Sequence, residues 1–171
     1  MVSPGPADPS APAPHEEVVI GVAAQIAATD ELIGLARRTI RVFEIDLAAT
    51  GWNDASRNDR LAAFLRGSRQ ARLDIITHDA RHIERECPRL CALLRRFGSA
   101  VTILSTGSDE HDATDPLLLV DERHFLHRFQ IDDSRAVLGI DRPAAAKALV
   151  QRFDTLWASG EPGLAGTVLG L

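Results

Sequence analysis

Polar side chains that could bind a ligand follow three apolar segments of the chain. The four candidate ligand-binding residues are Asp46, Trp52, His78 and Thr106. If the segments are parallel strands, their carboxyl ends meet at one edge of a sheet, where α/β proteins bind ligands. An imidazole and a hydroxyl beside a helix N-terminus would suit a small polar or phosphate-like ligand. The other interpretation is structural: Thr77 and Asp79 cap a helix, and the remaining residues are solvated loop.

Two clusters contain residue types that bind metals. The loop DEHDATD at 109–115 carries carboxylates and one imidazole, but it lacks the spacing and the glycine of a calcium loop. Cys87 and Cys91 lie four apart with His82 nearby, and no second CxxC or HxxxH completes a zinc site. We therefore expect a solvated acidic loop, two reduced buried thiols, and neither a metal nor another cofactor.

Composition limits the class of protein. The chain has 171 residues, 45% of them hydrophobic and 25% charged, which is typical of one soluble globular domain. Nineteen Lys and Arg against 24 Asp and Glu give a net charge of -5, which argues against a dedicated duplex-DNA binder. An arginine-rich stretch at 37–72 leaves nucleic-acid binding as the alternative to a solvated surface. No apolar run reaches the ~20 residues that cross a bilayer, and no secretory or transit signal is visible. We expect a cytoplasmic protein without a membrane partner.

The elements that position the candidate residues alternate between strands and helices. We predict strands at 40–47, 73–77, 100–105, 117–120, 125–129 and 135–140, and helices centred on 30–38, after Ser56, at 78–87, at 88–97 and from Pro143. Alternation of this kind predicts right-handed crossovers and a mostly parallel sheet. Nearly continuous apolar strands predict helices on both faces. The late strands are expected to add antiparallel neighbours.

We divide the chain into one α/β domain at 17–160 and two tails. The Pro/Ala-rich segment 1–16 is predicted to be disordered, because it has almost nothing to bury. Residues 161–171 are predicted to be a loose tail. Within the domain, a capping box is predicted from Ser56 to Asp59.

Several local sequences resemble the phospholipase D superfamily over residues 28–159. The segments are ARRTIRVFEIDL, ARLDIITHDAR, DPLLLVDERHFLH and ALVQRFDTLW. The chain is similar in particular to a bacterial family of short, degenerate members described as a domain of unknown function. The resemblance implies a single phospholipase D-like α/β domain, with a mostly parallel mixed sheet and helices on both faces.

The catalytic motif of that superfamily is only partly matched. Members carry HxKxxxxD followed by GSxN. Asp121 matches the Asp, whereas Thr114 stands in place of His and Pro116 in place of Lys. The GSxN positions fall on Arg128, Phe129, Gln130 and Ile131. In the superfamily the His attacks phosphorus and the Lys neutralises the phosphoryl oxygens, and Thr and Pro can do neither.

The sequence therefore predicts a non-catalytic phospholipase D-like module that binds a protein partner or a small polar or phosphate-like ligand. The alternative is a hydrolase or transferase with a rebuilt site at the strand rim, formed by His78, Asp46 and Thr106. Convergence of these three side chains on one pocket would favour the alternative. Superfamily sites are normally built from two such domains, so homodimer formation is a further possibility for this single domain.

Overall fold

The computed structural model describes residues 11–164, which build one mixed sheet. Three neighbouring strands inside this sheet run parallel. They are β2 (Thr39–Phe43), β3 (Arg72–Thr77) and β4 (Val101–Ser105). Val42 lies opposite Ile75, and Ile75 lies opposite Ile103. These strands confirm the parallel unit that the alternating pattern predicts.

Antiparallel strands extend this parallel unit on both sides. They are β1 (His15–Ile20), β5 (Leu117–Val120), β6 (His124–His127), β7 (Arg135–Ile140) and β8 (Glu161–Leu164), in the order β1-β7-β6-β5-β2-β3-β4-β8. Five of the seven neighbouring pairs within residues 11–164 are antiparallel. The mixed sheet is confirmed, but its parallel part is confined to β2–β4. Short connections such as the one from β5 to β6 join antiparallel strands, whereas a parallel pair needs a long crossover.

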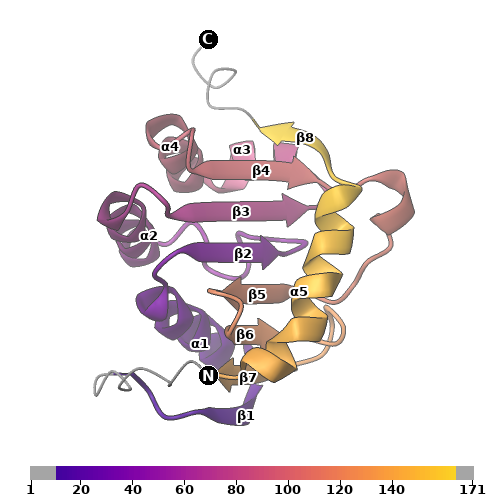
Figure 1. Ribbon diagram of the computed structural model, residues 1–171. Coiled ribbons are helices and arrows are strands. Elements are labelled where there is room, and N and C mark those ends of the chain that lie inside the picture. The colour runs from indigo at the N-terminus through magenta and orange to yellow at the C-terminus, as the bar shows by residue number, and fades with distance from the viewer. Residues whose placement is uncertain (1–10, 165–171) are drawn as a thin grey trace, which may run out of the picture.

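Helices cover both faces of the sheet, as predicted. They are α1 (Val22–Leu35), α2 (Ala55–Gly67), α3 (Ala80–Glu86), α4 (Pro88–Arg96) and α5 (Pro143–Ala158). Figure 1 shows α5 crossing one face, and the apolar contacts place α1–α4 on the other. Every helix in the described part of the chain is too short or too polar to cross a bilayer.

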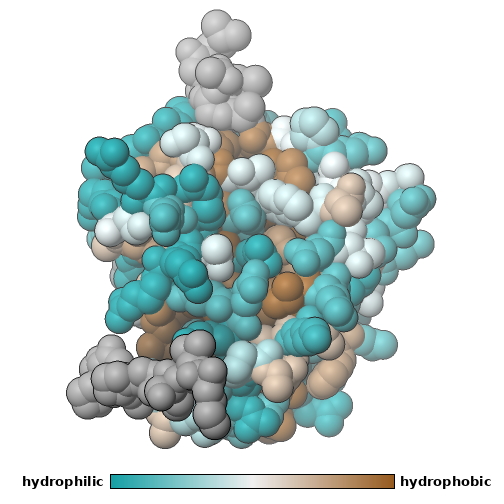
Figure 2. Space-filling view, viewed as in Figure 1, coloured by the Kyte–Doolittle hydropathy of each residue, from teal (hydrophilic) through white to brown (hydrophobic). Residues whose placement is uncertain are grey.

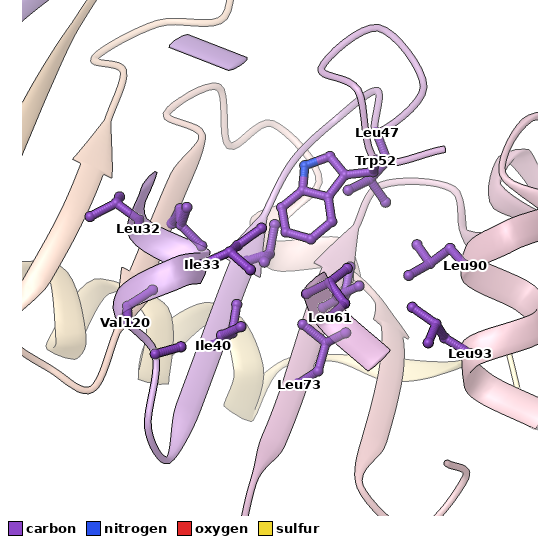
Figure 3. Packing of buried hydrophobic residues seen from close by; sticks show 14 of the residues in the cluster. Leu32, Ile33, Ile40, Leu47, Trp52, Leu61, Leu73, Leu90, Leu93 and Val120 are labelled. Atoms are coloured by element: carbon purple, nitrogen blue, oxygen red, sulfur yellow. The ribbon is translucent and has the colours of Figure 1, made fainter. Parts of the chain in front are cut away.

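The core consists of two apolar clusters separated by the sheet. Val42 belongs to the cluster under α1–α4, and its neighbour Phe43 belongs to the cluster under α5, because successive side chains of a strand point to opposite faces. Figure 3 shows the larger cluster, with Leu32, Leu61 and Leu90 of three helices beside the sheet. The outer surface seen in Figure 2 is mainly hydrophilic, with small apolar patches.

The start of α2 differs from the prediction. Asp54, not Ser56, is the N-cap, and its Oδ1 accepts hydrogen bonds from the backbone N–H of Ser56 and Arg57 at 2.8 and 3.2 Å. One carboxylate thus satisfies two of the free donors at the helix start, so the predicted capping box from Ser56 to Asp59 is wrong.

Residues 15–16 and 161–164, which the sequence assigned to tails, belong to strands. β1 begins at His15 and pairs with β7, and β8 pairs with β4. The domain therefore extends beyond 17–160 in both directions. A strand at a sheet edge is held mainly by main-chain hydrogen bonds. An apolar pattern in the sequence does not reveal such a strand. The outer parts of the two expected tails, 1–10 and 165–171, lie outside the described residues.

Candidate functional site

A cavity of about 290 Å³ lies between α1 and the sheet, beside the carboxyl end of β2. Its wall comes from α1, β2, the loop after β2, the start of β5 and the segment around the end of β6. Aliphatic side chains such as Ile26, Val42 and Leu118 form much of this wall. Its size is near the lower end of the ~300–1,000 Å³ typical of ligand pockets.

A buried ion pair lies in the wall of this cavity. Nη2 of Arg128 donates to both carboxylate oxygens of Glu44, at 2.9 and 2.8 Å. The two side chains are only 14% and 11% exposed, for Glu44 and Arg128 respectively. Burial raises the pKa of Glu44 from 4.5 to about 7, although the Arg128 guanidinium acts in the opposite direction. A carboxyl group that titrates near neutral pH inside a cavity is typical of functional sites.

Two of the four predicted ligand-binding residues line the same cavity. The Asp46 side chain is 48% exposed, and its Oδ1 accepts from the backbone N–H of Ala48 and Ala49. Trp52 is only 2% exposed and contributes its indole ring to the wall. The loop after β2 therefore brings one acidic and one aromatic side chain to the cavity.

Arg57 holds this loop against α1. Its fully buried guanidinium donates to Asp30 Oδ1 at 2.8 Å, to the Thr50 carbonyl at 2.6 Å and to the Ile26 carbonyl at 3.1 Å. The same group lies 5.3 Å from the ring centroid of Trp52, a cation–π contact. Two parts of the cavity wall, α1 and the loop after β2, are thereby joined by one side chain of α2.

The other two predicted residues meet at a separate, open hollow after β3. His78 Nδ1 lies 2.7 Å from Thr106 Oγ1, and Nε2 lies 2.7 Å from the Ala113 carbonyl. A carbonyl only accepts, so Nε2 carries a proton and donates, and in the neutral ring Nδ1 accepts from Thr106. His78 lines the open hollow, whereas Asp46 lines the cavity beside α1. His78, Asp46 and Thr106 therefore do not share one pocket.

The sequence predicted that the acidic loop between β4 and β5 is solvated, but two of its carboxylates are bound to α5. Arg152 donates to Asp115 at 2.9 and 3.0 Å and to Glu110 at 2.9 Å. Residues 11–164 contain no group of three or more His, Cys, Asp or Glu side chains placed to hold a metal. Cys87 and Cys91 are buried free thiols, and burial raises the pKa of Cys87 to about 11.

Three positions that the superfamily resemblance assigns to catalytic segments line the cavity: Pro116, Arg128 and Ile131. Thr114, which the resemblance aligns with the nucleophilic His, is exposed on the preceding loop. Asp121 accepts hydrogen bonds at 2.8 Å from the backbone N–H groups of residues 37, 38 and 39. The one matched motif residue thus ties the hairpin turn to the start of β2.

Sequence comparison identifies the family. Residues 22–164 match the profile of a family described as a domain of unknown function, DUF7931. The chain belongs to this family. No curated protein sequence matches the chain.

Solved structures similar to this DUF7931 domain include phospholipase D family members. Nuc from Salmonella typhimurium is 15% identical, with a TM-score of 0.57 over 87% of this chain and 97% of that chain. NucT from Helicobacter pylori is 12% identical, with a TM-score of 0.59 over 89% and 100% of the two chains. These likenesses show that the domain has the phospholipase D-like fold.

A third similar structure is TrmBL2, described as an archaeal chromatin protein with a novel mode of DNA binding. It is 11% identical, with a TM-score of 0.67 over 91% of this chain. The DUF7931 chain spans 56% of the TrmBL2 chain. At this identity the likeness concerns the fold alone.

The Glu44–Arg128 pair was not predicted from the sequence. One signal was available, since Glu44 is a charged residue within the apolar run IRVFEI, and a buried charge needs a partner. The identity of the partner had no such signal, because Arg128 is 84 positions away.

Proposed function

We propose that this DUF7931 domain is a non-catalytic phospholipase D-like module that binds a small polar ligand in the cavity beside Glu44 and Arg128. The observation that carries the proposal is the position of the cavity. Pro116, Arg128 and Ile131, which stand at motif positions of the superfamily, lie in its wall. This position supports a binding site at the place where the resemblance expects the superfamily site, built from other residue types.

The side chains around the cavity support binding rather than phosphoryl transfer. The described wall contains no His, Lys, Ser or Cys. Its two hydroxyl groups belong to Thr29 and Thr50, and both donate to backbone carbonyls of their own segments. Neither hydroxyl is hydrogen-bonded to a side-chain base of the described residues, and a hydroxyl without such a base is a weak nucleophile.

The alternative of a rebuilt catalytic site at the strand rim has less support. Both ring nitrogens of His78 are engaged, by Thr106 and by the Ala113 carbonyl. A general base must instead reach the proton that it removes from a substrate. A small ligand is also a better candidate than nucleic acid, since the net charge of -5 opposes binding to phosphate backbones.

A thermal-shift screen of small molecules tests the binding proposal, because a ligand of the native state raises the melting temperature. Ala49 is an exposed residue of the cavity wall, so Ala49→Trp would block the cavity without disturbing the core. Ala92→Trp, on an exposed position of α4, is the matched control. Ligands should lose their effect in Ala49→Trp and keep it in Ala92→Trp. Hits that stabilise both variants equally would place the binding site elsewhere.

Turnover assays test the non-catalytic part of the proposal. Purified protein is expected not to hydrolyse phosphodiester, phospholipid or nucleic-acid substrates above background. Reproducible turnover that His78→Ala or His111→Ala abolishes would contradict this expectation and favour the rebuilt site.

A second candidate function is binding of a protein partner through β1. This strand lies at an edge of the sheet, and its side chains Val18 and Ile20 are 61% and 67% exposed. Open strand edges with apolar side chains pair readily with another chain. If the partner is a second copy, light scattering should give a dimer mass for the wild type and a monomer mass for Val18→Lys. A wild-type monomer at high concentration would exclude self-pairing.

A further inference from the structure

We propose that the cavity beside Glu44 and Arg128 takes a small organic cation of the amine class, not a phosphate-like anion. This inference rests on the proposed function, because it specifies the ligand of the same site. It follows from the charges in the wall and from the hydrogen-bonding groups that the wall leaves without partners.

The charges of the described wall favour a cation. With Glu44 ionised, they are two carboxylates, Glu44 and Asp46, and one guanidinium, Arg128. Arg128 is engaged by both oxygens of Glu44, so an anionic ligand would have to compete with a carboxylate already bound at 2.8 and 2.9 Å. A cation meets no such competitor at Asp46 Oδ2.

Asp46 is poised to accept from a ligand. Its contacts within the described chain all involve Oδ1, which accepts from the backbone of residues 48 and 49 and lies 3.3 Å from His82 Nε2. Oδ2 accepts no hydrogen bond from the described residues. With its side chain 48% exposed, Asp46 can also be reached from solvent.

Gln25 gives a second and independent observation. It is only 7% exposed, lines the cavity from α1, and donates from Nε2 to the Ser134 carbonyl at 2.8 Å. A carbonyl cannot donate, so this bond fixes the orientation of the amide and directs Oε1 away from Ser134. Oε1 accepts no hydrogen bond from the described residues. Because Gln25 belongs to the cavity wall, Oε1 can accept from a ligand N–H.

The remaining polar groups of the wall follow the same pattern. Thr29 and Thr50 use their hydroxyl protons on backbone carbonyls at 2.9 and 3.3 Å, which leaves only lone pairs for a ligand. The indole N–H of Trp52 is a neutral donor on this wall. Acceptors therefore predominate, and an ammonium group, with a positive charge and up to three N–H donors, complements them. The aliphatic part of the wall suits a short hydrocarbon chain.

Four probes with the same hydrocarbon chain test the inference on the full-length protein: n-hexylamine, n-hexanol, n-hexanoate and n-hexyl phosphate. Isothermal titration calorimetry should show hexylamine binding about tenfold more tightly than hexanol, the difference typical of one charge-assisted hydrogen bond. Hexanoate and hexyl phosphate should bind more weakly than hexanol.

Asp46→Asn is the decisive variant, because an asparagine keeps an Oδ1 acceptor for the backbone of residues 48 and 49 but removes the charge. Hexylamine affinity should fall about tenfold, and hexanol affinity should not change. The matched control is Asp59→Asn, which removes the same charge from an exposed position of α2 and should leave both affinities unchanged.

The outcomes separate this inference from the proposed function. Tighter binding of hexyl phosphate or hexanoate than of hexanol would overturn the amine class while leaving a ligand cavity in place. Hexylamine binding that is unaffected by Asp46→Asn would also overturn it. Failure of all four probes, together with a small-molecule screen in which Ala49→Trp abolishes no hit, would overturn the proposed function as well.

Discussion

Two hollows of this domain are both lined by polar side chains, but the two sets of polar groups differ in whether the protein supplies their partners. In the open hollow, His78 is bonded to Thr106 through one ring nitrogen and to the Ala113 carbonyl through the other. In the cavity beside α1, Gln25 Oε1 and Asp46 Oδ2 accept no hydrogen bond from the described chain. The first set of polar groups is largely satisfied by the protein, whereas the second leaves acceptors for a ligand.

This difference shows that a polar side chain after a strand is weak evidence for a binding site. A His in a loop and an Asp in a loop are equivalent in the sequence pattern. They differ in whether folding supplies partners for their donors and acceptors, because a satisfied group gains little from a ligand. The predictions below test whether the two regions are energetically and functionally distinct.

The largest loss of unfolding free energy is expected from Arg128→Met. It leaves the Glu44 carboxyl buried without its partner, which typically lowers the free energy of unfolding by ~3–5 kcal/mol. Urea denaturation at neutral pH measures the loss. The double variant Glu44→Gln, Arg128→Met should recover part of it, since no buried acid remains. A loss below about 1 kcal/mol for the single variant would mean that the pair behaves as a solvated surface pair.

The next largest effect is a dependence of the unfolding free energy on pH through Glu44. The pKa of Glu44 is raised from 4.5 to about 7, so the folded state retains a proton that the unfolded state has released in this range. The contribution of Glu44 is therefore most favourable below pH 4.5 and is lost as the pH rises through 7. Relative to Glu44→Gln, the wild type should lose on the order of 3 kcal/mol of unfolding free energy between pH 4.5 and 8.

Urea denaturation at several pH values, for both proteins, measures this difference and cancels the titration of the histidines. Asp59→Asn is the control, and its difference from the wild type should have no comparable slope over the same range. A wild type that gains stability relative to Glu44→Gln as the pH rises would show that Arg128, not burial, dominates the pKa.

A smaller effect is expected from His78→Phe in the open hollow. The substitution keeps an aromatic ring but leaves the Ala113 carbonyl without its donor, which should lower the unfolding free energy by ~1–3 kcal/mol, measured by urea denaturation. Hexylamine affinity should be unchanged, because His78 does not line the cavity. Loss of hexylamine binding in a folded His78→Phe variant would show that the two regions are coupled.

The smallest effect is expected from Thr106→Val. It removes one hydroxyl donor from His78 Nδ1 and should lower the unfolding free energy by about 1 kcal/mol, the typical contribution of one hydrogen bond. Thermal denaturation and hexylamine titration measure the two consequences, and the affinity should not change. A destabilisation as large as that of Arg128→Met would contradict the distinction between the regions.

Local patterns in the sequence were sufficient for much of the fold. The apolar segment 73–77 corresponds to β3 (Arg72–Thr77), and the helix expected from Pro143 corresponds to α5. Periodicity reports which residues a strand or helix buries, and this information is local. The two edge strands were missed because they are held chiefly by main-chain hydrogen bonds, which all residue types except proline can donate.

The chain alone thus indicated an α/β domain of the phospholipase D-like class, and the resemblance predicted Thr114 and Pro116 in place of its His and Lys. The cavity and its ion pair arise only on folding. Glu44 and Arg128 are 84 positions apart, and Gln25 and Ser134 are 109 apart. Whether a polar group is satisfied depends on partners that packing brings from distant segments, and no local pattern in the sequence records those partners.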